Sequence, residues 1–159
     1  LEREVALRWV QSGAEGWLLI DGPVNLAPAL VATGRAVGVV KSHRTQFLGP
    51  DAMLDVLTMP PGHRSAVFRP LRPQVGDVYS WYVRLRDREG RDLYFGLVRV
   101  EAPAAPETLE RADEITAWLL DETRPVALPD PRWDTLLYPI RDCETYLRAR
   151  MPTLWPDDR

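Results

Sequence analysis

The sequence contains very little cysteine, histidine or lysine. Cys143 is the only cysteine, which excludes an internal disulfide and a cysteine-based zinc site and fits a reducing cytoplasm. No apolar run approaches the roughly 18–20 residues that a membrane span requires. The opening residues lack the basic start and apolar core of a secretory signal. The hydrophobic content of 45% and the charged content of 27% are those of an ordinary globular protein.

The net charge of −3 argues against a protein that coats nucleic acid. The charge is unevenly distributed, however: residues 1–105 have 13 basic and 11 acidic side chains, whereas residues 106–159 have 7 and 12. The stretch 35–75 is either a solvated basic face or a local phosphate-binding surface. Its two acids, Asp51 and Asp55, are outnumbered by six bases: Arg35, Lys41, Arg44, Arg64, Arg69 and Arg72.

Lys41 is the only lysine among the 20 basic residues. The abundance of Ala, Arg, Pro and Asp is typical of a GC-rich genome, in which arginine replaces lysine where either serves. A lysine that is kept indicates that a compact ammonium group matters at that position. The alternative is that its retention is a matter of chance.

Apolar periodicity and turn residues predict one domain with mixed strands and helices over residues 1–159. We expect strands at 16–21, 36–42, 65–70, 78–86 and 93–101, and a hairpin loop at 87–92. We expect helices at 1–11, 24–33 with an interruption near Pro28, 51–58, 108–122 with Thr108 as cap, and 140–150. These elements indicate an α/β or α+β sheet protein.

Asp21 ends the apolar run 16–21 and is followed by Gly22 and Pro23. One interpretation is structural, with the carboxylate capping the turn or the next helix. The other is a metal ligand, since strand alternation puts Asp21 on one face with Trp17 and Leu19, where an acid needs a partner.

A second carboxylate for such a metal could come from Glu2 or Glu4, on the helix that leads into the strand. Oxygen ligands of this kind suit Mg²⁺ or Mn²⁺ and could support phosphodiester cleavage. The alternative is that both acids lie at a solvated helix end. In the last predicted strand, Arg99 and Glu101 share a face, which predicts an ion pair that holds the edge of the sheet.

An ordered series of short motifs runs through nearly the whole chain. The series comprises a Glu-bearing helix, Leu18-Leu19-Ile20-Asp21-Gly22-Pro23, Ala36-Val37-Gly38-Val39-Val40-Lys41-Ser42, Gly62-His63-Arg64-Ser65, Tyr79-Ser80-Trp81-Tyr82-Val83-Arg84-Leu85, Gly96-Leu97-Val98-Arg99-Val100-Glu101 and Tyr138-Pro139. In its order and spacing the series resembles the NurA family of DNA-end-processing nucleases.

The resemblance implies an RNase H-like mixed sheet flanked by helices and a Mn²⁺- or Mg²⁺-dependent DNA nuclease. It also implies a homodimer that acts on DNA ends with a HerA-type hexameric ATPase in double-strand-break repair or phage defence. The implied catalytic residues are Asp21 and Glu4 as metal ligands (Glu2 being the weaker candidate), Lys41, Tyr138 and Tyr146. The implied DNA contacts are Lys41, His43, Arg44 and Arg64.

The sequence departs from the family pattern at two points. The family has an earlier Asp-Gly-Ser strand, which we expect to lie before Leu1, so that this chain lacks an N-terminal portion. The family also has a histidine after its Tyr-Pro motif, where the nearest residue here is Tyr146, which cannot act as an acid or base near neutral pH. We therefore expect a rearranged site, a weak nuclease, or a subunit that binds DNA or the ATPase without cutting.

Overall fold

Four strands form a single mixed sheet in the computed structural model, which describes residues 2–71, 76–123 and 146. The strands are β1 (Leu18–Asp21), β2 (Ala36–Val40), β3 (Val78–Arg84) and β4 (Leu97–Pro103). Their order across the sheet is β1-β2-β4-β3. β1 and β2 are parallel, whereas β4 is antiparallel to both of its neighbours. The carboxyl ends of β1 and β2 therefore meet at one edge of the sheet.

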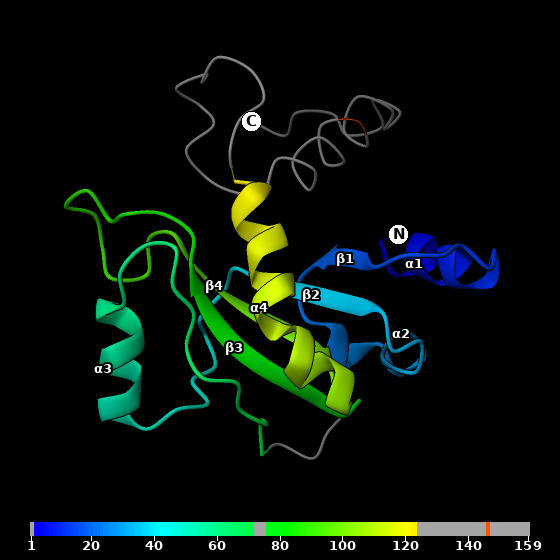
Figure 1. Ribbon diagram of the computed structural model, residues 1–159, viewed down its shortest axis with the longest axis horizontal. Coiled ribbons are helices and arrows are strands. Elements are labelled where there is room, and N and C mark those ends of the chain that lie inside the picture. Colours follow the sequence, from blue (N-terminus) through cyan, green and yellow to red (C-terminus); the bar gives the residue numbers. More distant parts are fainter. Residues whose placement is uncertain (1, 72–75, 124–145, 147–159) are drawn as a thin grey trace, which may run out of the picture.

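The helices lie on both sides of this sheet. They are α1 (Glu2–Gln11), the 3₁₀ turn η1 (Val24–Leu26), α2 (Pro28–Val31), α3 (Pro50–Thr58) and α4 (Pro106–Asp121). α4 crosses one face of the sheet, while α1 and α2 lie toward β1 and β2 and α3 lies toward β3 (Figure 1). None of the helices in the part of the chain that the structure describes has the length and apolar character needed to cross a membrane.

The core is divided by the sheet, because alternate residues of each strand point to opposite faces. The α4 face holds the largest cluster, which includes Val37, Val39, Trp81, Val83, Val98, Val100, Ile115 and Leu119. The opposite face holds two clusters, one around η1 and α2 with Val24, Leu30 and Ala36, and one around α3 with Met53, Val56, Tyr82 and Leu97. β2 and β4 are buried throughout, as expected for central strands.

The structure confirms the predicted α/β class, while an RNase H-like topology stays a prediction. The expected helix at 24–33 divides at Pro28 into η1 and α2. α4 begins at Pro106, because proline is suited to the first helical position. Thr108 is therefore not the cap that we predicted; it is buried and its hydroxyl donates to the Pro103 carbonyl at 2.6 Å.

The predicted strand at 65–70 is wrong. This segment makes only two isolated bridges to β3, one between Arg64 and Val83 and one between Phe68 and Ser80. Three residues of the segment stand opposite two of β3 between these bridges, which is the geometry of a β-bulge. The hydroxyl of Ser65 accepts the Tyr82 N–H at 2.9 Å, in a position where a regular ladder would use a carbonyl.

β4 begins four residues later than the predicted strand at 93–101, because residues 92–96 turn. The Tyr94 N–H donates to the side chain of Asp92 at 2.8 Å, and Gly96 has a φ of 69° that favours glycine. The predicted hairpin pairing of β3 with β4 is confirmed. The predicted helix at 140–150 lies outside the described residues except for Tyr146, which is helical.

Candidate functional site

Asp21 and Lys41 meet at the carboxyl ends of β1 and β2. Lys41 Nζ donates to Asp21 Oδ2 at 2.9 Å. The parallel register sets Asp21 opposite Val39, so that the lysine two residues further along lies on the same face as Val39. About a quarter of each side chain is exposed, 28% for Asp21 and 25% for Lys41. The pair is thus held by the sheet but open to a ligand.

The environment of Asp21 bears on the capping interpretation of its role, while the metal-ligand interpretation stays a prediction. Trp17 and Leu19 both pack against the cluster on the α4 face, which confirms that they share one face of the strand as predicted. The turn after Asp21 relies on Gly22, which has a φ of 98° and donates its N–H to the Val39 carbonyl at 2.8 Å. η1 has no side-chain cap hydrogen bond, so the capping interpretation of Asp21 is wrong for this helix.

Glu4 is not brought to Asp21. Its carboxylate accepts from Arg8 at 2.7 Å, one turn along α1, and 61% of its side chain is exposed. Ala6 of α1 packs with Leu18 and Ile20, on the face of β1 opposite Leu19. Within residues 2–71, 76–123 and 146, no three His, Cys, Asp or Glu side chains are grouped as a metal site requires. Of the two predicted metal ligands, Asp21 lies beside Lys41 and Glu4 lies beside Arg8, so the structure does not bring them together.

His43 lies in an aromatic environment on the other side of the sheet. Its Nε2 is 2.9 Å from the Leu97 carbonyl, and its ring stacks on Tyr94 with centroids 5.1 Å apart. Nδ1 is buried without a hydrogen-bond partner among the described residues. Burial lowers the pKa of His43, and the charges of Arg99 and Arg84 lower it further, although the bond to Leu97 opposes them. The structure therefore gives His43 a packing role, and its predicted contact with DNA stays untested.

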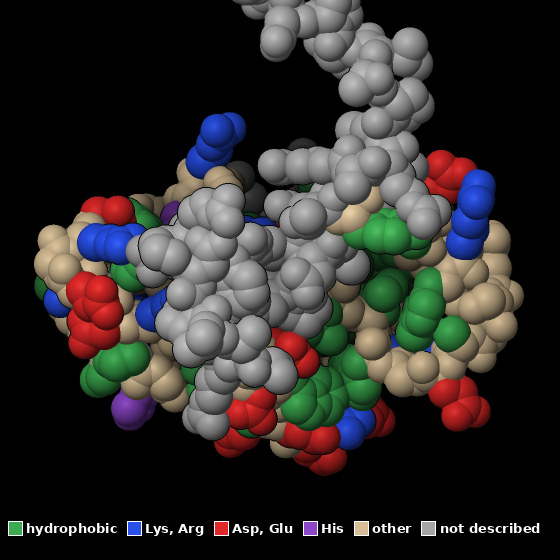
Figure 2. All heavy atoms as spheres, turned by 90° about the horizontal axis from the view of Figure 1, so that it is seen from above, with side chains coloured by type: hydrophobic (Ala, Val, Ile, Leu, Met, Phe, Trp, Pro, Cys, Tyr) green, Lys and Arg blue, Asp and Glu red, His purple; other side chains and the backbone are tan. Residues whose placement is uncertain are grey.

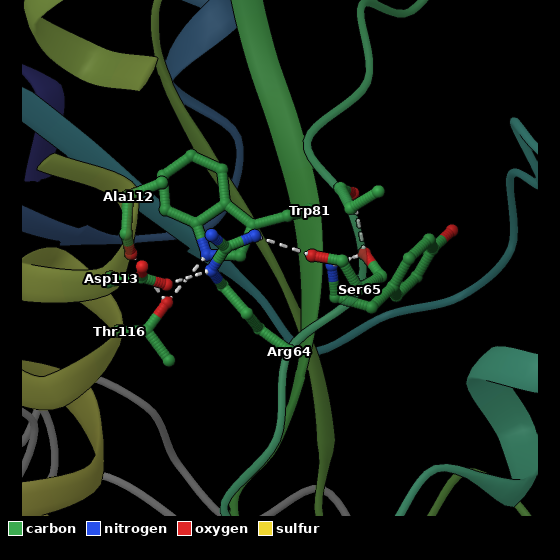
Figure 3. Close-up of polar contacts among 8 residues, drawn as sticks. Arg64, Ser65, Trp81, Ala112, Asp113 and Thr116 are labelled. Carbon is green, nitrogen blue, oxygen red and sulfur yellow. Dashed lines mark hydrogen bonds and ion pairs between the residues drawn. The ribbon is translucent and has the colours of Figure 1, made fainter. Parts of the chain in front are cut away.

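Arg64 contacts α4, as Figure 3 shows. Its Nε donates to Asp113 Oδ1 at 2.6 Å, and Nη1 donates to the Ser65 carbonyl at 2.8 Å. Beside this ion pair, the indole N–H of Trp81 donates to the hydroxyl of Thr116 at 3.0 Å. The charge of Arg64 is thus balanced by an acid of α4, and Arg64 lies next to β3, at the opposite edge of the sheet from Asp21.

The basic stretch 35–75 does not form one surface. Three of its bases are in ion pairs that connect different elements: Lys41 with Asp21, Arg64 with Asp113, and Arg69 with Asp77. Arg44 is exposed, whereas Arg72 lies outside the described residues. Figure 2 shows acidic side chains along the margin where α4 lies. A path for DNA is therefore unfavourable across α4.

Sequence reasoning placed the Arg99–Glu101 pair wrongly. The ion pair exists, but β4 is a central strand and not an edge, and both side chains are buried. The pair lines a cavity on the face opposite α4. The sequence did contain a signal for this buried polar pair, since Arg99 and Glu101 are two residues apart within an apolar strand. Charged residues on one face of a buried strand seldom serve packing alone.

Of the two predicted C-terminal site residues, the structure describes Tyr146 alone. Tyr138 lies outside the described residues. Tyr146 is helical and 55% exposed.

No protein-family model matches the sequence, and comparison with curated proteins finds no match.

Proposed function

We propose that this protein is a metal-dependent DNA nuclease of the NurA type, with Asp21 as a cation ligand and Lys41 as a phosphate contact. The proposal is supported by the 2.9 Å contact between these two residues at the carboxyl ends of two parallel strands. Open α/β sheets bind their ligands at this edge. The partial exposure of both side chains supports access by a substrate.

The two side chains have complementary tasks in this proposal. Asp21 accepts the lysine through Oδ2, which leaves Oδ1 for an oxygen-preferring cation. A partly exposed ion pair contributes only about 1 kcal/mol or less, so Lys41 can turn from the carboxylate to a phosphate at little cost. A bound Mg²⁺ or Mn²⁺ would supply an activated water. Residues outside the described part would complete the ligand set, because Glu4 pairs with Arg8 and its helix packs on the face of β1 opposite Asp21.

The proposed substrates and partners follow from the family resemblance. DNA ends are the substrate, a HerA-type hexameric ATPase is the partner, and a homodimer is the working form. Arg44 is exposed and follows Lys41 by three residues, and we assign it a contact with the DNA backbone.

The test is cleavage of linear duplex DNA by the whole chain in Mn²⁺. Asp21→Asn should lower the cleavage rate by at least about 100-fold, since it removes the ligand charge without changing the side chain's shape. Asp55→Asn, on the exposed side of α3, makes the same chemical change outside the site and should cleave at the parental rate. Equal rates for the parent and Asp21→Asn would refute the assignment.

A second function is supported by the charge balance of the site. Asp21 is already neutralised by Lys41, and no three potential ligands are grouped in the part of the chain that is described. These observations favour a subunit that binds DNA or the ATPase without cutting. Such a subunit would show no cleavage in Mn²⁺ or Mg²⁺, yet would bind DNA with an affinity that falls as salt rises.

A further inference from the structure

The buried ion pair of Arg99 and Glu101 lies in β4, one of the two central strands of the sheet. Glu101 has 0% of its surface exposed and Arg99 has 6%. Both side chains point to the face opposite α4, because they alternate with Val98 and Val100, which pack on the α4 face. The pair is therefore separated by the sheet from the site at the ends of β1 and β2.

Glu101 holds the turn that follows Asp21. One oxygen of its carboxylate accepts from Arg99, and the other, Oε2, accepts the backbone N–H of Asn25 at 3.2 Å. Asn25 lies four residues after Asp21, and its own carbonyl accepts the N–H of Gly76 at 3.0 Å. The carboxylate thus connects the centre of the sheet to the backbone that leaves β1.

Arg99 contacts the loop that follows Lys41. Its guanidinium carbon lies 4.6 Å from the ring centroid of Phe47, which is a cation–π contact. The same guanidinium donates to Glu101 and lies 3.4 Å from the hydroxyl of Ser80, so its position is fixed from both β3 and β4. Phe47 lies six residues after Lys41. Arg99 thus connects the centre of the sheet to the backbone that leaves β2.

Stability alone does not account for this ion pair. Apolar residues in place of a buried ion pair are often as stable or more stable. Apolar side chains could fill the same space, but they could not accept the N–H of Asn25 or place a cation on the ring of Phe47. Both of these contacts have a defined direction, and each one holds a different strand exit.

We infer that Arg99 and Glu101 are positioning residues for the contact between Asp21 and Lys41. Because one ion pair holds both the turn after Asp21 and the loop after Lys41, it fixes where the two strand ends lie relative to each other. The effect of this positioning on cleavage rests on the proposed function. The contact between Asp21 and Lys41 can itself be measured without metal or DNA.

The test of the geometry uses the only lysine of the chain. Lysine labelled with ¹³C at Cε gives one NMR signal for Lys41, which is recorded on the whole chain in buffer with a chelator. Asp21→Asn marks where this signal lies when the carboxylate charge is lost. The double variant Arg99→Met, Glu101→Leu should move the signal in the same direction. An unmoved signal in a double variant that urea unfolding shows to be folded overturns the inference.

Two substitutions of Phe47 test the loop while the buried ion pair stays intact. Phe47 is partly exposed, so that both variants should fold. Phe47→Leu removes the ring that Arg99 contacts and should move the Lys41 signal, whereas Phe47→Tyr keeps the ring and should leave the signal at the parental position. Equal signals in these two variants overturn the inference, whether or not the double variant folds.

Cleavage of linear duplex DNA in Mn²⁺ supplies the functional readout. The double variant and Phe47→Leu should lower kcat by at least about tenfold, because small displacements of groups in an active site are costly. Phe47→Tyr should cleave at the parental rate. A parental kcat in both the double variant and Phe47→Leu overturns the positioning role. A parent that does not cleave refutes the proposed nuclease instead, and the Lys41 signal then decides the positioning role alone.

Discussion

Lys41, the only lysine of the chain, donates to Asp21 at 2.9 Å across the ends of two parallel strands. The two residues are twenty positions apart in the sequence and come from different strands. Their contact explains why an acid is tolerated at the end of an apolar strand. It also couples the two residues electrostatically, because a change in either one alters the charge that the other faces.

Replacement of Lys41 should separate catalysis from stability. Lys41→Met is expected to slow DNA cleavage in Mn²⁺ by at least about tenfold, because it removes the charge that would face a phosphate. The free energy of unfolding should change by about 1 kcal/mol or less, since the pair is partly exposed. Cleavage assays and urea unfolding measure the two effects. A large loss of stability with unchanged cleavage would assign Lys41 a purely structural role.

Gly38 should not tolerate a methyl group. A Cβ at this position would lie 2.6 Å from the Gly22 carbonyl oxygen and 2.7 Å from the Val24 nitrogen, both of them backbone atoms of the turn after Asp21. Gly38→Ala is therefore expected to lower the free energy of unfolding by about 1–3 kcal/mol. The same substitution at Gly49, where a Cβ meets nothing, should cost clearly less. Chemical denaturation of both variants tests the difference, and equal costs would contradict the close approach.

Arg84 should be essential for the stability of the end of the sheet near α3. Its guanidinium is buried and donates to three backbone carbonyls: Phe95 at 2.5 Å, Leu57 at 2.8 Å and Leu93 at 3.0 Å. Arg84→Met should leave these carbonyls without a donor and lower the free energy of unfolding by about 3 kcal/mol or more. Urea unfolding checks this value, with Arg44→Met as the exposed control. A cost similar to that of the control would show that water replaces the guanidinium.

Stability should depend on pH through His43. Burial lowers its pKa in the folded protein below the ordinary value of 6.5, so the unfolded chain binds a proton first as the pH falls. The contribution of a neutral His43 is thus complete above pH 6.5 and declines below it, by up to about 1.4 kcal/mol per pH unit. Urea midpoints between pH 5 and 8 should show this decline. His43→Gln should flatten it, and an equal decline in both proteins would exclude His43 as the cause.

Local sequence patterns predicted most elements of the fold. Gly16 and Gly22-Pro23 bound the apolar run that became β1, and Gly34 precedes the run that became β2. The apolar stripe that contains Ile115 and Leu119 predicted α4. The strand expected at 65–70 failed because strand propensity does not specify a partner: there the hydroxyl of Ser65 takes a position in the ladder and a bulge breaks the pairing. Whether the Ser65 hydroxyl or a backbone carbonyl accepts the Tyr82 N–H depends on how β3 lies beside the segment, which the local sequence does not specify.

The candidate site, like the fold, was predicted in part by the sequence and decided in part by the tertiary structure. Residue type and strand alternation already predicted a charge on a defined face at the end of each strand, although β1 is partly exposed rather than buried. Only the tertiary structure decided that these two charges meet, because their distance depends on the parallel register of β1 with β2. The tertiary structure likewise separated Glu4 and His43 from Asp21, because they lie on the opposite face of the sheet. Sequence spacing carries no information about which elements cover each face.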